Sequence, residues 1–597
     1  MAASTRTDGF AALADYGVLG DGRTVALVAT DGSVDWWPIP TLDAPPVCAA
    51  ILDPVAGGSF VLVPEGDFEA RRRYLPGTNV LETVYTTEGG SARVTEALNT
   101  GSSGRLPWNE LVRRVDGIVG HVPMRWAVIP GQRFGNVEPT ITDHDGTPII
   151  RLDDQTLAVL VDGMDPGVVS DTGVRGRFVA EGGHRALLAV VATDDEPLFL
   201  PPIAAIDRRL DRTVESWRRW RDLIDYDGPW AEAVIRSALA LKTLLYEPGG
   251  AIAAAATTSL PEKIGGPKNW DYRYAWIRDS SFTLDAFIAL GLHEEVHASV
   301  SWLIDAMRRS EPELHIFYDL EGGVPEGETR LDAPGYRASR PVRAGNDASS
   351  QTQLGIYGDL FDTVHRYVQA GHLLDPHTAE LLAGYADRCV KVWDTRDSGI
   401  WELSDLEHYT ISKIGCWMAL DRAGQLAAAG QLPDDRMERW RDQAAEIRTW
   451  VHAHCWSEAK QSYTFYAGTE DLDASVLLAG RTGFDRGPRL ASTIDAVVSE
   501  LGSGIAPLLY RYTGMGAEEG AFVACTFWLV DALVHTGQID QARRVMDDAV
   551  TLGNDVGILS EQVDPASGAS LGNLPQGLSH LALINAAHTL GRALPSP

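Results

Sequence analysis

The chain has 597 residues, of which 45% are hydrophobic and 22% are charged, the balance of an ordinary soluble globular protein. Its 51 Lys and Arg against 82 Asp and Glu give a formal net charge of −31, which disfavours nucleic acid and anionic membrane surfaces as partners. The length allows two or three domains with a large hydrophobic core.

The cysteines, the N-terminal residues and the longest apolar run together indicate an intracellular protein. Five cysteines, odd in number and set in apolar sequence, predict buried free thiols and a reducing compartment: Cys48, Cys389, Cys416, Cys455 and Cys525. Residues 1–8 have no apolar core, so no secretory signal is expected. The longest apolar run, 521–534, is shorter than the ~20 residues that span a bilayer. We therefore expect a cytoplasmic location and no membrane partner.

The first third of the chain alternates apolar and polar residues between turn sequences, a pattern typical of β-strands. The predicted strands are 24–28, 33–39, 59–64, 79–86, 92–97, 124–129, 148–152, 156–161 and 185–191. Because no long helix separates them, they predict an N-terminal antiparallel β-sandwich domain over residues 1–205. Apolar residues at three- and four-residue spacing over 207–224 predict a linker helix, which we place in segment 206–228.

From residue 229 the apolar period changes to 3.6, and most of the segments end at a glycine. The predicted helices are 229–247, 279–291, 294–310, 349–371, 376–394, 408–430, 434–456, 473–483, 489–502, 520–537, 538–553 and 575–591. Twelve helices form six pairs, and six helical hairpins predict an all-α (α/α)6 double-layered barrel over 229–597. If the even-numbered helices lie inside, the long loops that enter them meet at one end, where we expect the site.

These loops bring aromatic rings, carboxylates and an Arg–Asp pair to the same end of the barrel. The segments are 269–279, 336–346, 399–405, 466–473, 511–519 and 560–575. Sugar rings stack their CH faces on aromatic rings and share their hydroxyls with charged donors and acceptors. The composition therefore predicts a carbohydrate site.

At these residues the chain resembles glycoside hydrolase family 15, which includes glucoamylases, glucodextranases and some bacterial trehalases and isomaltose-hydrolysing enzymes. The resemblance covers nearly the whole chain and is most specific at Asn269–Asp279. It implies that Arg278 and Asp279 bind the outer hydroxyls of the non-reducing-end glucose, with Trp276 as a further substrate contact. A lone Arg–Asp pair would instead be a helix cap with an exposed ion pair.

Two further segments imply the catalytic carboxyls. Residues 398–403 resemble the family's general-acid segment, which implies Glu402 as the general acid and Trp401 as a substrate contact. A glutamate beside a tryptophan can be desolvated enough to keep its proton near neutrality, and the glycosidic oxygen needs that proton to leave. Residues 557–562 and 572–576 resemble the base segment, which implies Glu561 as the general base. Taken alone, Glu402 would more often be a solvated carboxylate beside a buried ring, and Glu561 would be a glutamate in the N-terminal turn of a loop helix.

Weaker matches imply Arg343 and Glu519 as substrate contacts, with structural ion pairs as an equal alternative. His293 and His297 fit the zinc pattern His-Glu-x-x-His, but they lie at a helix start just after Gly291 and lack a third ligand. We expect no metal and no cofactor.

The resemblance implies an inverting, exo-acting α-glucoside hydrolase that releases β-glucose from the non-reducing end of short α-gluco-oligosaccharides. The expected lack of a secretory signal and of a starch-binding module favours short intracellular substrates over raw starch. Among these we favour isomaltose and related α-1,6-glucosides, with trehalose or malto-oligosaccharides as alternatives. Two rival functions remain: a glycoside phosphorylase of similar barrel fold, which would need a basic anion pocket at Glu561, and a non-catalytic sugar-binding protein. A small carbohydrate is the only partner expected, and the sequence leaves the oligomeric state open.

Overall fold

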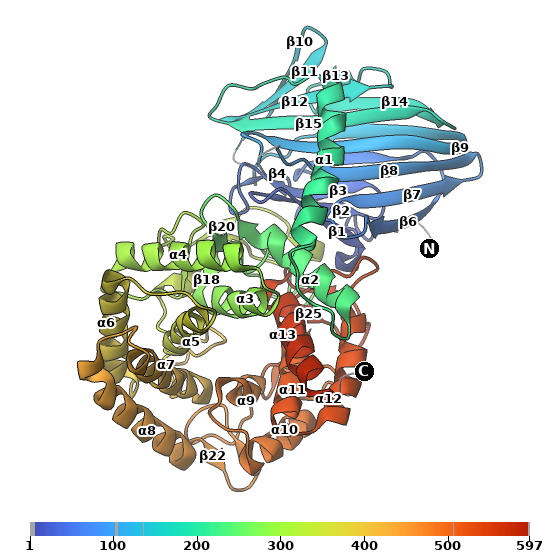
Figure 1. Cartoon of the computed structure of the whole chain (residues 1–597). Coiled ribbons are helices and arrows are strands. Elements are labelled where there is room, and N and C mark those ends of the chain that lie inside the picture. Colours follow the sequence, from blue (N-terminus) through green and yellow to red (C-terminus); the bar gives the residue numbers. More distant parts are fainter. Residues whose placement is uncertain (1–5, 102–104, 135–136, 506, 595–597) are drawn as a thin grey trace.

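The computed structural model describes residues 6–101, 105–134, 137–505 and 507–594. Residues 1–5, part of the segment that lacks a predicted secretory signal, lie outside the described residues. An antiparallel, sheet-rich N-terminal part is followed by a helical C-terminal part (Figure 1). In the described ranges, no helix combines the length and apolarity that a membrane span requires. All five cysteines are buried and unpaired, as predicted.

Each predicted strand is present in the N-terminal part. The predicted strands correspond to β2 (Val25–Ala29), β3 (Ser33–Pro38), β5 (Ser59–Pro64), β7 (Leu81–Thr87), β8 (Gly90–Leu98), β9 (Asn109–Ile129), β11 (Thr147–Leu152), β12 (Gln155–Asp162) and β15 (Arg185–Asp194). The sequence did not predict β1 (Tyr16–Gly20), β4 (Pro46–Cys48), β6 (Glu69–Tyr74), β10 (Thr140–His144), β13 (Val168–Ser170) and β14 (Gly173–Glu181). Strand β1 is buried along its whole length, so it lacks the alternation of a half-buried strand.

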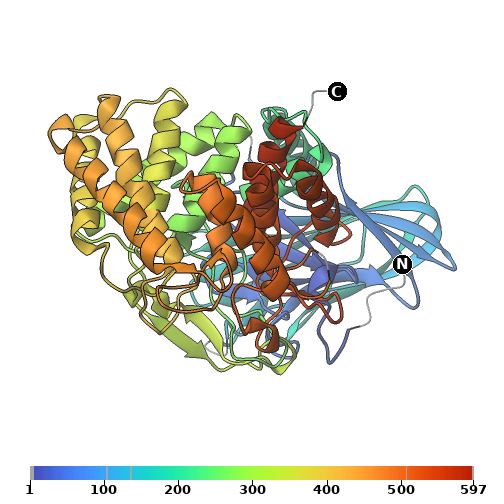
Figure 2. The same ribbon diagram turned by 90° about the horizontal axis from the view of Figure 1, so that it is seen from below.

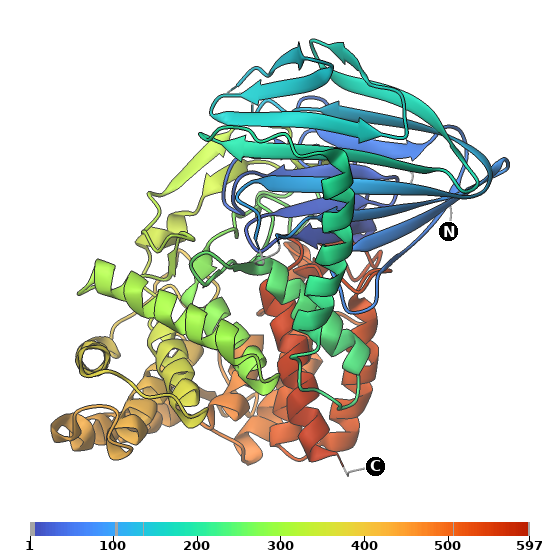
Figure 3. The same cartoon turned by 45° about the horizontal axis from the view of Figure 1, so that its top comes forward.

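The long strand β9 connects the two halves of the sheet. Its first part pairs with β8 and β15, and its second part pairs with β5 and β14, all antiparallel. Helix α1 (Ile203–Arg221) lies against β9, β12 and β15 (Figure 3). A helix lies in the predicted linker segment, and it starts four residues earlier than predicted, at Ile203 rather than Asp207.

A helix lies in every predicted helical segment of the C-terminal part. They are α2 (Ala231–Leu244), α3 (Ile277–Ala289), α4 (His293–Ser310), α5 (Gly355–Gln369), α6 (Pro376–Val392), α7 (Thr410–Ala428), α8 (Met437–His454), α9 (Ala479–Thr482), α10 (Pro488–Leu501), α11 (Val523–His535), α12 (Ile539–Ala549) and α13 (Gly577–Ala593). The predicted helix 349–371 begins later, at Gly355, after a separate 3-10 turn, and most of 473–483 is a 3-10 turn.

The even-numbered predicted helices form a closed ring. Helices α3, α5, α7, α9, α11 and α13 each contact the next, and α13 returns to contact α3. Figure 1 shows α4, α6, α8, α10 and α12 outside this ring. Helices α7 and α11 are buried almost all the way round, which is typical of a helix enclosed by other helices.

The long loops that enter the ring helices gather at one end of them, together with short strands. Figure 2 shows this end with the hairpin of β20 (Glu328–Leu331) and β21 (Val342–Gly345). The N-terminal part contacts these loops, because Trp36 Nε1 donates to Ala256 O at 2.9 Å. Arg273 Nη1 donates to Ala44 O at 2.9 Å. The sheet-rich part therefore supports the loops of this end.

Candidate active site

The loops at this end line a small, partly enclosed cavity. The predicted site residues that line it are Arg278, Asp279, Trp401, Glu402 and Glu561. They come from the first turn of α3 and from the loops before α7 and α13. The folded chain thus brings both predicted catalytic carboxyls and the Arg–Asp pair to one cavity.

Glu402 is held by hydrogen bonds to its side chain and its backbone. Trp276 Nε1 donates to Glu402 Oε1 at 2.7 Å, and Gln351 Nε2 donates to Glu402 O at 3.1 Å. Glu402 has a φ of +60°, a left-handed conformation that non-glycine residues adopt mainly where the surroundings impose it. Burial raises the pKa of Glu402 above its usual value, while Arg278 and the Trp276 hydrogen bond oppose the rise. This environment suits a carboxyl that keeps its proton.

The two predicted tryptophan contacts occupy different positions. Trp276 is fully buried, stacks on Phe317 at 4.4 Å between ring centroids, and is not among the residues that line the cavity. It reaches the site through its hydrogen bond to Glu402. Trp401 lines the cavity, and its Nε1 donates to Asp473 Oδ1 at 2.8 Å.

Arg278 and Asp279 form a buried pair in the first turn of α3. Arg278 Nη2 lies 2.9 Å from Asp279 Oδ2, and the two side chains are 12% and 3% exposed. Arg278 Nη1 also donates to Ile400 O at 2.8 Å, two residues before Glu402. The alternative of an exposed helix-cap ion pair is therefore wrong for these residues.

Glu561 is buried, with 1% exposure, and its Oε2 accepts the backbone N–H of Asn573 at 3.1 Å. Gly572 packs directly on it with a φ of +71°, and a Cβ there would lie 2.6 Å from Glu561 Cβ. A side chain at residue 572 would therefore displace the carboxylate. Burial raises the pKa of Glu561 well above its usual value, and the carboxylate of Glu262 raises it further.

Glu519 lies one contact away from the cavity. It is not among the lining residues; Arg511 Nε donates to Glu519 Oε1 at 2.6 Å, and Arg511 does line the cavity. Sequence reasoning missed Arg511, although it is the one basic residue in loop 511–519. Tyr272 and Gln576 also line the cavity, and neither was predicted.

Arg343 lies outside the lining of the cavity. It forms an ion pair with Glu328 across the β20–β21 hairpin and stacks over Trp270 at 4.4 Å. These contacts are those of a structural ion pair, which was the alternative to substrate binding. The role of Arg343 as a substrate contact stays a prediction, as does that of Glu519.

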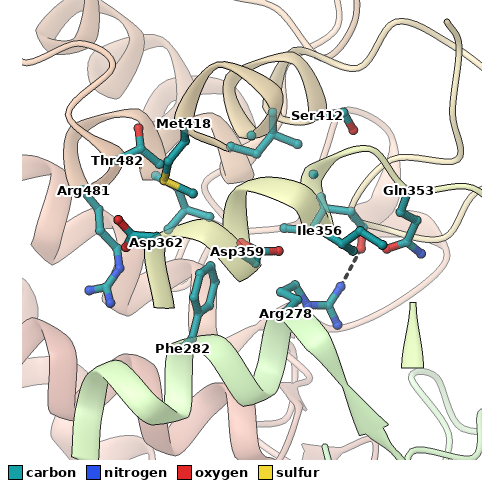
Figure 4. Close-up of a pocket in the computed structure, with 15 residues that line it drawn as sticks. Arg278, Phe282, Gln353, Ile356, Asp359, Asp362, Ser412, Met418, Arg481 and Thr482 are labelled. Carbon is teal, nitrogen blue, oxygen red and sulfur yellow. Dashed lines mark hydrogen bonds between the residues drawn. The ribbon is translucent and has the colours of Figure 1, made fainter. Parts of the chain in front are cut away.

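A second chamber lies inside the helix ring and shares Arg278 and Ile400 with the catalytic cavity. Figure 4 shows the Asp359 carboxyl in the middle of this chamber, between Arg278 on one side and Asp362 and Arg481 on the other. Arg278 is paired with Asp279, and Arg481 with Asp285. Burial raises the pKa of Asp359 to about 7, and Arg278 limits the rise.

We expect Asp359→Asn to stabilise the protein above pH 7. An unfolded Asp titrates near pH ~3.9. Between about pH 4 and 7 the folded chain therefore holds a proton that the unfolded chain has already lost. Wild-type stability therefore falls as pH rises from about 4 to 7 and stays lower above pH 7, and the neutral Asn avoids this loss. Thermal unfolding at pH 8 should show a higher Tm for the variant, by roughly 1 °C per kcal/mol recovered, because the unfolding entropy of ~2.1 cal/mol/K per residue is large for a chain of 597 residues.

At pH 4 the two proteins should unfold at similar temperatures, because Asp359 is protonated in the folded chain. Asp347→Asn, a change of an exposed residue just before α5, is the matched control and should leave Tm unchanged at both pH values. An Asp359→Asn variant that is less stable than wild type at pH 8 would contradict the prediction.

In the described part of the chain, no group of three or more His, Cys, Asp or Glu side chains has the arrangement of a metal site. His297 Nδ1 lies 2.7 Å from the Tyr367 hydroxyl, and neither His293 nor His297 lines the catalytic cavity.

Two buried carboxyls and a buried Arg–Asp pair line this one cavity, and glycoside hydrolases use two carboxyls that flank the bond they cleave. Comparison with known proteins agrees. The profile of the glycosyl hydrolases family 15 matches residues 228–588, and that of a trehalase-like N-terminal region matches residues 10–219. The chain belongs to glycosyl hydrolase family 15 and is a glycoside hydrolase.

The similar curated proteins are named trehalases. That of Mycolicibacterium smegmatis is 34% identical over 99% of this chain and 93% of its own length. That of Mycobacterium tuberculosis is 34% identical over 98% and 90%, and that of Thermoplasma volcanium 30% identical over 98% and 95%. A bacterial glucoamylase, solved in complex with acarbose, shares the fold with a TM-score of 0.72 at 14% identity, covering 99% of this chain and 97% of that one.

Proposed function

We propose that this enzyme hydrolyses trehalose with inversion at the anomeric carbon of one of its two glucose units, releasing that glucose as the β-anomer. The observation that carries the proposal is that Glu402 and Glu561, far apart in the sequence, line one cavity together with Arg278 and Asp279. The chain is an α-glucoside hydrolase by family, and its similar curated proteins are named trehalases. These names favour trehalose over isomaltose, which the sequence alone favoured.

In the proposed mechanism Glu402 donates its proton to the glycosidic oxygen as the bond to the anomeric carbon breaks. Glu561 takes a proton from a water molecule that attacks the anomeric carbon from the opposite face. Arg278 donates to, and Asp279 accepts from, hydroxyls of the glucose that loses its leaving group. The buried pair is preorganised for this contact, because its geometry is already set without substrate.

The charges around Glu561 argue against a phosphorylase. Such an enzyme would need a basic pocket for phosphate where the base lies. Glu561 instead has Glu262 and Glu519 near it, with Arg511 already paired to both of them. The two catalytic carboxyls on one cavity likewise argue against a sugar-binding protein without activity.

A panel of trehalose, isomaltose, maltose, panose and kojibiose, read by glucose release with and without phosphate, tests the proposal. We expect trehalose to be cleaved with the highest kcat/KM. None of the reactions should consume phosphate. Glucose 1-phosphate formed only with added phosphate would identify a phosphorylase. A higher kcat/KM on isomaltose would return the preference to α-1,6-glucosides.

For the architecture we propose a β-sandwich over residues 1–205, a linker helix in 206–228 and an (α/α)6 barrel over 229–597. The closed ring of α3, α5, α7, α9, α11 and α13 supports the barrel. The antiparallel pairing through β9 supports the sandwich. The cytoplasmic location stays a prediction.

A further inference from the structure

A buried carboxyl that the mechanism above does not use lies beside Glu561. Glu262 is 1% exposed, and its Oε2 lies 2.7 Å from Arg511 Nη2. Its Oε1 has no hydrogen-bond partner among the described residues. A buried carboxylate oxygen without a partner is costly, so its presence next to a catalytic group calls for a functional reason.

Backbone hydrogen bonds hold Glu262 against the base segment. Gly572, which packs on the Glu561 carboxylate, donates its amide to Pro261 O at 2.8 Å. Gly520 donates its amide to Glu262 O at 3.0 Å. The position of Glu262 relative to Glu561 is therefore set by the backbone on both sides.

The charges of this cluster do not balance. Arg511 and Lys268 face three buried carboxyls, those of Glu262, Glu519 and Glu561. Arg511 is shared between Glu262 and Glu519, and Lys268 Nζ lies 3.0 Å from Glu519 Oε2. Within the described residues Glu561 has no ion pair. Its negative charge is therefore opposed by that of Glu262 and is not neutralised by a cation in contact.

We propose that Glu262 is a positioning residue that sets the basicity of Glu561: its negative charge makes Glu561 a stronger base than an isolated glutamate. The inference rests on the proposed function, in which Glu561 takes a proton from water. A general base works best when its pKa lies near the working pH, and a like charge nearby raises a carboxyl pKa in that direction.

The titration of the neighbouring groups agrees with this role. Burial raises the pKa of Glu262 to about 7, with Arg511 opposing the rise, and burial together with Glu262 raises that of Glu561 well above its usual value. Other titratable groups face the cluster, and one of them is Tyr512, whose pKa is raised by burial and lowered by Arg511 and Lys268. Burial and the carboxylate of Glu561 keep Tyr272 neutral by raising its pKa, and Glu518 pairs with Lys268 at the surface.

The experiment is the pH dependence of kcat/KM for wild type and Glu262→Gln, with trehalose and with α-glucosyl fluoride. The acidic limb reports ionisation of the base. We expect it to move down by about one pH unit in the variant, the scale on which a nearby like charge shifts a buried carboxyl. The pH-independent kcat should fall roughly threefold, because a weaker base transfers the proton more slowly. Both substrates should show the shift, since both need the water.

Glu518→Gln is the matched control. It removes the same charge from the same cluster, but its side chain is 56% exposed and contacts Lys268. Its acidic limb should stay with that of wild type. Glu262→Asp, which keeps the charge, should also keep the wild-type limb. If Glu262→Gln does not fold, Glu262→Met removes the charge at similar volume and carries the same expectation.

Three results would overturn the inference. The first is an acidic limb that does not move in Glu262→Gln, or that moves to higher pH. The second is a rise in KM with an unchanged limb, which would assign Glu262 the purely structural task of holding Arg511. The third is a wild-type limb below about pH 5, within the ordinary range of a Glu carboxyl. Loss of the proposed function would look different, because wild type itself would then cleave no α-glucoside.

Discussion

Glu402→Gln is expected to lower the turnover of trehalose by about 100-fold or more, the scale of general acid catalysis. The amide cannot donate the proton that the leaving sugar oxygen needs, while Trp276 can still hold the side chain in place. On α-glucosyl fluoride, whose leaving group needs little protonation, the loss should be much smaller. Steady-state kinetics on both substrates measure the difference.

Glu407→Gln is the matched control for this change. It alters a carboxyl of the same loop that pairs with Arg396 and does not line the cavity. Its rates should remain close to wild type on both substrates. Equal losses for Glu402→Gln on trehalose and on the fluoride would indicate lost binding or misfolding, and near wild-type turnover of trehalose would remove Glu402 from the role of acid.

Glu561→Ala is expected to reduce turnover by roughly 10²–10⁴-fold on every substrate, including α-glucosyl fluoride, because each reaction needs an activated water. Inversion requires ~6.5–9.5 Å between the two carboxyls, room for that water. Wild type should therefore release β-glucose first from α-glucosyl fluoride. Proton NMR recorded before mutarotation identifies the anomer.

Azide supplies the control for the base. In Glu561→Ala a small anion can occupy the space of the lost carboxylate and water, so azide should restore turnover of α-glucosyl fluoride and give β-glucosyl azide. In Glu561→Gln that space stays filled, and azide should not help. Release of α-glucose first, or an α-linked azide product, would contradict a single displacement at the anomeric carbon.

The helices could be predicted from the local sequence pattern because a glycine follows the end of most ring helices. Gly291, Gly371 and Gly430 end their helices with positive φ, as the sequence predicts. The start of α5 was not readable. No glycine or proline marks a boundary between Gln351 and Leu354, but Leu354 N donates to the Asp397 carboxylate of another loop, and this contact holds the segment outside the helix.

The site was predictable where a short motif contains the functional residue. Glu402, Glu561, Arg278 and Asp279 all lie in such motifs and line one cavity. Trp276 shows the limit of a motif: it lies two residues from Arg278, yet it faces Glu402 and not the cavity. A motif identifies the residues of a site, but the direction in which each side chain points depends on the neighbouring loops.

The sequence by itself determined the order of the nine predicted strands and of the helices, the family and the chemical types of the site, because each depends on residues close together along the chain. Tertiary structure decided which of these residues meet. Arg511 and Glu519 lie eight residues apart on one loop, and Glu262 lies on another loop. Only the closed ring brings their charges to Glu561. Their effect is electrostatic and depends on distance and burial, which local patterns do not encode.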